Sequence, residues 1–258
     1  MNARPPLSGL PDIGACARPL PGLPAPGDLI ESPDYAFAFR RLEPVPDRPA
    51  RLLVALHGAD GDELQFADVL AGLRAGDAVV LARGPRTLPG ERTGWYREAV
   101  RDGDATADGD DFDESLSRLV AFVGQLQQHL DISPRDTVLV GFSQGGALAL
   151  SAAVTTPECC GAVAVIGGRL PRRVEPQVEM PPSLGGIDVL LLHAPDDEVL
   201  PPAHAHDAAA FLTAQQMAPE LRFTGRGHAL SPPAVAALRQ WLARAGVSPV
   251  ASGRNGRH

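Results

Sequence analysis

The chain has 258 residues, of which 44% are hydrophobic, so it can bury one sizeable core, and α/β folds of this length are often single domains. The formal net charge of −8, with no evident basic face, argues against a nucleic-acid partner and against an anionic membrane surface. All 23 basic residues are arginine, which excludes any mechanism that needs a lysine Schiff base.

Cysteine usage and hydropathy together predict a cytoplasmic location. The three cysteines are Cys16, Cys159 and Cys160, and a sparse, odd set that includes a vicinal pair is typical of a reducing compartment. The N-terminus lacks the continuous apolar core of a signal peptide, and no apolar run reaches the length of about 18 residues that crosses a membrane. We therefore expect no membrane insertion, while a homodimer stays open.

The first half of the chain predicts strands and helices separated by long irregular stretches. Residues 1–33 are rich in proline and are expected to form an extended or disordered arm rather than a helix or a central strand. Residues 83–111 are also expected to be irregular. Apolar patterns predict strands at 35–42, 51–56 and 78–82, the first of them near an edge of the sheet, and helical spacing at 64–73 and 112–130.

The second half alternates more regularly. Apolar runs predict strands at 136–142, 161–166, 187–192 and 221–223, and helices at 143–153, 203–217 and 234–245. This alternation predicts an α/β fold with a mostly parallel central sheet and helices on both faces. We place the domain at residues 34–247, with a loose tail at 248–258, and expect active groups at the carboxyl ends of the strands.

The stretch Gly141–Gly146, with the sequence GFSQGG, fits the nucleophile-elbow pattern G-x-S-x-G around Ser143. A serine at the tip of a strand-to-helix turn is strained, and side chains two residues before and after it would collide as strand and helix converge. Gly141 and Gly145 remove that collision. The alternative is a glycine-rich turn with an incidental serine, because so short a pattern also arises by chance.

A nucleophilic serine of this kind needs an acid and a histidine later in the chain, each in a loop after a strand. The loop after the third of the later strands offers Asp196, Asp197 and Glu198, and the loop after the fourth offers His228. Their order and placement predict a catalytic triad in which His228 accepts the Ser143 proton. Spacing alone leaves the choice among the three carboxylates open.

The negative charge that develops on a substrate oxygen needs backbone N–H donors. One expected donor is the N–H of Gln144, the residue after the nucleophile, and the other lies in the loop at residues 57–62, at Ala59. His57, in the same loop, is expected to shape it rather than to act as a base. No metal and no organic cofactor are expected.

These motifs resemble those of the phospholipase/carboxylesterase family of α/β-hydrolases, which includes acyl-protein thioesterases. The resemblance covers roughly residues 35–245, and GFSQGG is its most specific mark. Its other marks are Leu56-His57-Gly58, Gly61-Asp62-Glu63, Gly94-Trp95-Tyr96, His193…Asp197-x-Val199 and Gly227-His228.

The resemblance implies an α/β-hydrolase fold, Asp197 as the acid, and Trp95 and Tyr96 as substrate-binding walls of the cleft. Two positions depart from the family pattern: Ala194 replaces a glycine after the loop histidine, and Asp60 replaces a glycine in the oxyanion loop. Aspartate tolerates a left-handed backbone better than most residues, so the loop can keep its shape. Residues 167–186 are too few and too proline-rich for a multi-helix cap, so we expect no large lid domain.

The sequence therefore predicts a cofactor-free serine hydrolase that cleaves small to medium carboxylic esters or thioesters through an acyl-enzyme on Ser143. One alternative keeps the triad and changes the substrate, to a lactone or a peptide. A second is a hydrolase fold that binds a ligand without turnover. The complete Ser, Asp and His set argues against this last reading, because binding alone would not require all three.

Overall fold

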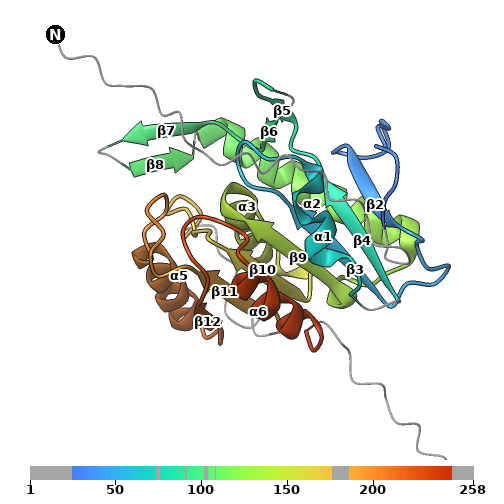
Figure 1. Cartoon of the computed structure of the whole chain (residues 1–258). Helices are drawn as coiled ribbons and strands as arrows, with labels where there is room; N and C mark the ends of the chain where they lie inside the picture. Colours follow the sequence, from blue (N-terminus) through green and yellow to red (C-terminus); the bar gives the residue numbers. More distant parts are fainter. Residues whose placement is uncertain are drawn as a thin grey trace, which may run out of the picture.

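A central β-sheet organises the structure (Figure 1). The computed structural model describes residues 25–73, 76–90, 92–101, 104–107, 109–175 and 186–245, and in these residues eight strands form the sheet in the order β1-β2-β4-β3-β9-β10-β11-β12. From β4 to β12 all neighbours are parallel, whereas β2 is antiparallel to β4 and β1 to β2. The mostly parallel α/β sheet predicted from the sequence is confirmed.

Most strands of this sheet are buried on both faces. The strands are β1 (Ala25–Pro26), β2 (Phe39–Glu43), β3 (Arg51–Leu56), β4 (Asp77–Ala82), β9 (Thr137–Phe142), β10 (Ala162–Ile166), β11 (Asp188–His193) and β12 (Glu220–Phe223). Every residue of β3, β4, β9 and β10 is buried. A strand covered on both faces is apolar at nearly every position, which explains the continuous runs of Val, Leu and Ala in the sequence.

Helices cover the two faces of the sheet. One face packs against α2 (Gly109–Leu130), α3 (Ser143–Thr155) and α5 (Ala203–Ala214), and the other against η1 (Glu63–Phe66), α1 (Ala67–Leu70) and α6 (Pro232–Leu242). The single turn η2 (Pro134–Asp136) precedes β9, and the single turn η3 (Pro157–Cys159) follows α3. Successive strand residues alternate between the two layers, so Val54 packs in the first and Leu53 and Ala55 in the second.

Two antiparallel hairpins occupy the segment that we expected to be irregular, and that expectation is wrong. They are β5 (Arg86–Thr87) with β6 (Thr93–Gly94), and β7 (Glu98–Arg101) with β8 (Asp104–Ala107). Figure 1 shows the second hairpin projecting beyond the central sheet. Composition does not predict it, because its strands contain only Val100 and Thr106 as β-branched residues.

The ends of the domain also differ from expectation. Strand β1 pairs with β2, so the sheet includes residues that we assigned to the N-terminal arm. The helix predicted at residues 64–73 ends at Leu70, because Ala71 (φ −59°, ψ 135°) and Gly72 (φ +76°) form a turn in which Leu73 N donates to the Leu70 carbonyl oxygen. Residues 1–24, 176–185 and 246–258 lie outside the described residues. None of the helices in the described part of the chain combines the length and apolarity needed to cross a lipid bilayer.

Candidate active site

Ser143 lies at the turn between β9 and α3, with a φ of +51°, in the left-handed region of backbone space. Neighbouring glycines make this turn possible. A Cβ on Gly141 would lie 2.4 Å from the Gly145 carbonyl oxygen, and a Cβ on Gly145 would lie 2.4 Å from the His57 carbonyl oxygen. Both distances are far inside van der Waals contact, so neither position tolerates a side chain. The strand, turn and helix have the geometry that the G-x-S-x-G pattern predicts.

The His228 imidazole lies between Ser143 and Asp197. Its Nε2 is 2.8 Å from Ser143 Oγ, and its Nδ1 is 2.7 Å from Asp197 Oδ2. Because a carboxylate can only accept, Nδ1 carries a proton and Nε2 is left to accept from the serine hydroxyl. The structure thus brings together three side chains from the loops after β9, β11 and β12, which are the three that the sequence and the family resemblance select.

Asp197 is fixed by the backbone of its own loop. Its Oδ1 accepts hydrogen bonds from Val199 N at 3.0 Å and Leu200 N at 2.8 Å, which leaves Oδ2 for His228. The buried His193 holds the far end of the loop, with Nε2 2.8 Å from the Leu200 carbonyl oxygen. Val199 itself is 72% exposed, so it does not anchor the loop in the core. Hydrogen bonds rather than apolar packing orient the acid.

Asp196 has a different role from its neighbour. Its Oδ1 accepts from Gly227 N at 2.8 Å, and Gly227 has a φ of +56°. This bond joins the acid loop to the loop that carries His228. Asp196 therefore holds backbone, whereas Asp197 contacts the imidazole.

On the other side of Ser143, His57 organises the loop in which Ala59 lies. His57 Nε2 is 3.0 Å from Gly84 N, which can only donate, and 2.9 Å from Thr93 Oγ1. Its Nδ1 is 2.6 Å from the Gly58 carbonyl oxygen, so Nδ1 carries the proton. Burial lowers the pKa of His57, and the Gly58 carbonyl, Asp62 and Glu63 oppose this only in part. His57 is thus held neutral.

Asp60 takes the left-handed backbone that the family's glycine would take, with a φ of +59°. Its carboxylate is 62% exposed and lies 4.0 Å from Arg92 Nη1, at the surface. The substitution keeps the loop conformation, as expected, and places the new charge in solvent. The Ala59 and Gln144 N–H groups stay our predicted oxyanion donors.

The Gln144 side chain makes contacts that the sequence did not predict. It is 5% exposed, its Oε1 accepts from Trp95 N at 2.7 Å, and its Nε2 donates to the Tyr96 carbonyl oxygen at 2.9 Å. Trp95 Nε1 donates in turn to the His57 carbonyl oxygen at 2.8 Å. The residue after Ser143 is therefore tied through residues 95–96 to the loop that carries Ala59.

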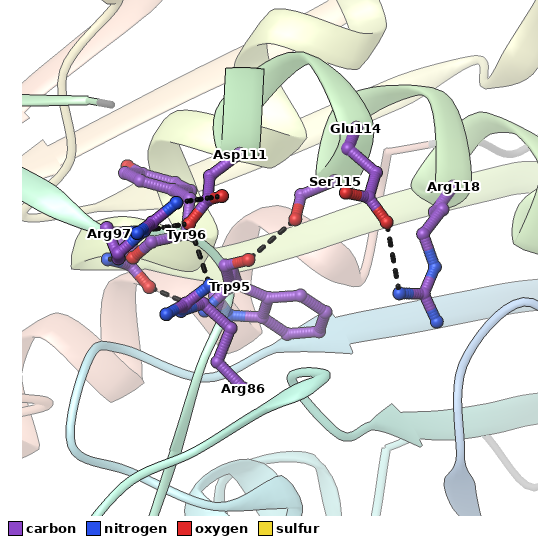
Figure 2. A network of polar contacts seen from close by, with 9 residues as sticks. Arg86, Trp95, Tyr96, Arg97, Asp111, Glu114, Ser115 and Arg118 are labelled. Carbon is purple, nitrogen blue, oxygen red and sulfur yellow. Dashed lines mark hydrogen bonds and ion pairs between the residues drawn. The ribbon is translucent and has the colours of Figure 1, made fainter. Parts of the chain in front are cut away.

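A second set of contacts fixes residues 95–97 from the outside, as Figure 2 shows. Arg97 binds both carboxylate oxygens of Asp111 at 2.7 and 2.9 Å, and Arg86 reaches the same carboxylate at 2.7 Å. The hydrogen bond from Arg97 lowers the pKa of the Asp111 carboxyl. Ser115 Oγ donates to the Trp95 carbonyl oxygen at 2.6 Å. The start of α2 thus positions the segment that Gln144 holds.

Trp95 and Tyr96 are buried, with exposed fractions of 1% and 4%. Trp95 packs edge-on against Phe37, and Tyr96 edge-on against Phe112. Their contact with substrate stays a prediction. What the structure establishes is that both residues pack in the core and that their backbone is held by Gln144.

Residues 43–245 match the model of the family described as Phospholipase/Carboxylesterase. The chain belongs to this family. The match covers the nucleophile turn and the loops that carry the acid and the histidine. Membership places the chain among hydrolases of the carboxylesterase and thioesterase type.

Solved structures share the fold of this family member at low identity. The carboxylesterase from Mesorhizobium loti superposes with a TM-score of 0.72 and 20% identity, covering 84% of this chain and 100% of that one. The Bacillus cereus carboxylesterase has a TM-score of 0.68 and 18% identity, covering 79% of this chain and 92% of that one. Zea mays acyl-protein thioesterase 2 has a TM-score of 0.62 and 21% identity, covering 79% of this chain and 96% of that one. These similarities establish the α/β-hydrolase fold. A search of curated protein sequences found no significant match.

Proposed function

We propose that the protein is a serine hydrolase that cleaves carboxylic esters or thioesters through an acyl-enzyme on Ser143. One observation carries the proposal. The 2.8 Å contact from Ser143 to His228 continues in a 2.7 Å contact from His228 to Asp197, on a serine held in a left-handed turn. A hydroxyl, a base and a carboxylate in this sequence of contacts form a triad in which the base relays the hydroxyl proton to the leaving group and the carboxylate supports the charged base.

In the proposed reaction, Ser143 Oγ attacks the carbonyl carbon while His228 Nε2 takes the hydroxyl proton. The tetrahedral intermediate collapses, the bond to the alcohol or thiol breaks, and His228 returns the proton to that leaving group. A water then attacks the acyl-enzyme with His228 again as base, releasing the acid and restoring Ser143. Asp197 holds the Nδ1–H tautomer and stabilises the imidazolium in both steps.

The oxyanion of each tetrahedral intermediate lies, in this proposal, against the N–H groups of Gln144 and Ala59. Support comes from position, because Gln144 is in the first turn of α3, where backbone N–H groups are free of helix partners and the helix dipole is positive. Removal of one such donor typically costs about 3–4 kcal/mol of barrier. The Gln144 side-chain contacts would keep both donors at a fixed separation.

Composition supports the remaining parts of the proposal. The substrate is a small to medium ester or thioester, the location is cytoplasmic, and the reaction needs no cofactor. The described residues contain no large lid domain over the loops that carry the relay. Lactone or peptide hydrolysis would use the same relay, and a homodimer stays open.

A fluorophosphonate probe tests the proposal, because it labels only an activated serine. We expect the wild-type protein to be labelled and to hydrolyse p-nitrophenyl esters, and Ser143→Ala to lose both while keeping its circular dichroism spectrum. Labelling that persists in Ser143→Ala would place the nucleophile elsewhere. An unlabelled, inactive wild-type protein that still binds an ester would support the binding-module alternative.

A further inference from the structure

Arg169 lies beside the proposed reaction centre. It follows β10 by three residues, and the intervening glycines contact the site: a Cβ on Gly167 would lie 3.5 Å from His228 Cε1, and a Cβ on Gly168 would lie 3.3 Å from Ala147 N in α3. Leu170 and Val174, on the other side of Arg169, are buried in the core. Arg169 therefore projects from a stretch of backbone that is held at both ends, next to the histidine and the first turns of α3.

Among the described residues, the Arg169 guanidinium has no carboxylate partner. The side chain is half-buried, and within the described part of the chain it takes part in no ion pair and no hydrogen bond. Arg173, in the same loop, pairs with Asp113 on α2. Partial burial of a charge costs hydration free energy, and without a partner no interaction within the protein offsets that cost. Such a group therefore favours an anion in the adjoining space.

Three acids in the surrounding loops are directed to other groups. Asp197 contacts His228, Asp196 accepts from Gly227 N, and Asp60 lies at the surface beside Arg92. The charge on Arg169 also acts on Tyr96, in the segment held by Gln144. Burial raises the pKa of the Tyr96 hydroxyl, Glu98 raises it further, and Arg169 opposes both. Arg169 is thus close enough to Tyr96 to act on its hydroxyl electrostatically, while Gly167, two residues before it, lies against His228.

We propose that Arg169 determines substrate specificity by binding an anionic group, a carboxylate or a phosphate, on the ester or thioester that Ser143 attacks. This inference rests on the proposed function and narrows its substrate class. Guanidinium groups bind both anions through paired N–H donors, and a hydrogen bond to a charged partner is stronger than a neutral one. The anion can belong to the acyl part or to the leaving group.

Matched ester pairs test the proposal. For the acyl part, p-nitrophenyl valerate is compared with the mono-p-nitrophenyl ester of glutaric acid, which has the same chain length and a terminal carboxylate. For the leaving group, p-nitrophenyl acetate is compared with a nitrophenyl acetate that carries a ring carboxylate. In one of these two ester pairs, we expect Arg169→Gln to lower the ratio of kcat/KM for the anionic ester to kcat/KM for the neutral ester by about tenfold or more.

The chain provides controls for charge and for loop position. Arg172 lies in the same loop and is exposed, so Arg172→Gln changes the net charge equally and should leave the ratio within about twofold of wild type. Arg169→Lys keeps the charge and should retain part of the preference. Added salt should reduce the wild-type ratio, because it screens a charge contact at a solvent-accessible site.

The outcomes separate this proposal from the one on which it rests. If Arg169→Gln changes neither ratio by more than Arg172→Gln does, while neutral esters are cleaved and Ser143 is labelled, the role of Arg169 is wrong and the hydrolase proposal stands. If no ester is cleaved and Ser143 is not labelled, both fall together. The arm in which the ratio drops identifies the part of the substrate that carries the anion.

Discussion

The two sides of Ser143 are built from different kinds of contact. On the side of β11 and β12, the central contacts join side chains: His228 lies between Ser143 and Asp197, and backbone N–H groups hold the carboxylate. On the side of β3 and β6, most of these contacts are to backbone: Gln144 binds residues 95–96 through its amide, and His57 binds Gly84 N and the Gly58 carbonyl besides Thr93 Oγ1.

The two histidines show what this difference achieves. His228 is 14% exposed in its side chain and faces a carboxylate, which would stabilise the imidazolium formed in the proposed reaction. His57 is 1% exposed, and burial lowers its pKa. A proton relay needs a group that changes charge during the reaction. A scaffold for backbone donors needs one that does not.

On the side of β11 and β12, we expect the largest loss of activity from a substitution of Asp197. Asp197→Asn keeps the shape but loses the charge that stabilises the imidazolium and can favour the wrong tautomer of His228. We expect kcat to fall by up to about 10⁴-fold, with little change in KM, in steady-state assays on a p-nitrophenyl ester.

Asp196→Asn is the matched control, since its amide oxygen can still accept from Gly227 N. We expect kcat to change by less than about tenfold, because this bond positions backbone and no charge is needed at the imidazole. A crippled Asp196→Asn beside an active Asp197→Asn would reverse our assignment of the acid.

On the side of β3 and β6, we expect activity to fall when the Gln144 side chain is replaced. Gln144→Met removes both amide contacts and leaves the Trp95 N–H and the Tyr96 carbonyl without these partners, so the proposed oxyanion donors lose their fixed separation. We expect kcat to fall by about 10- to 100-fold, and fluorophosphonate labelling to slow in parallel.

Gln125→Met controls for the stability cost of that change. Gln125 lies in α2, where its Oε1 accepts from Ala36 N at 2.9 Å, whereas the Gln144 amide bonds to Trp95 and Tyr96. The Gln125→Met substitution should lower the free energy of unfolding by about 1 kcal/mol and leave kcat unchanged. Equal rates for the two variants would mean that the Gln144 side chain serves only the fold.

The smallest effect concerns His57 and pH. Because its folded pKa lies below the usual 6.5, the unfolded state binds more protons between the two values, and stability rises with pH in that window. The contribution is complete above about pH 6.5 and is lost as pH falls towards the folded pKa. Urea unfolding of the wild-type protein should show this decline, and His57→Gln should show a shallower one. An unchanged slope in His57→Gln would assign the decline to other groups.

Steric patterns made the reaction centre predictable. The nucleophile turn leaves a local trace, because two glycines must flank the serine at fixed spacing, and the acid and histidine must follow strands in order. The choice of Asp197 came from the family resemblance. The backbone contacts that orient it, two donors from Val199 and Leu200, have no sequence pattern of their own.

The scaffold was less accessible to prediction. Gln144 and Trp95 are 49 residues apart, and a buried amide that bonds to backbone requires no particular partner side chain. The hairpin β7–β8 has few of the residues that favour strands, and the pairing of Arg97 with Asp111 depends on it and on the start of α2. Arg169 is visible in the sequence, but only the folded chain shows that the acids described near it contact other groups.

The left-handed backbone of Ser143 has a consequence for heat inactivation. A non-glycine residue in this conformation costs of order 1 kcal/mol or more and persists only while the surrounding contacts enforce it. A slight loosening where Gly141 and Gly145 press against their neighbours would let the serine relax into an ordinary conformation, away from His228. On heating, the enzyme should therefore lose its activity reversibly at temperatures where its sheet and helices are still folded.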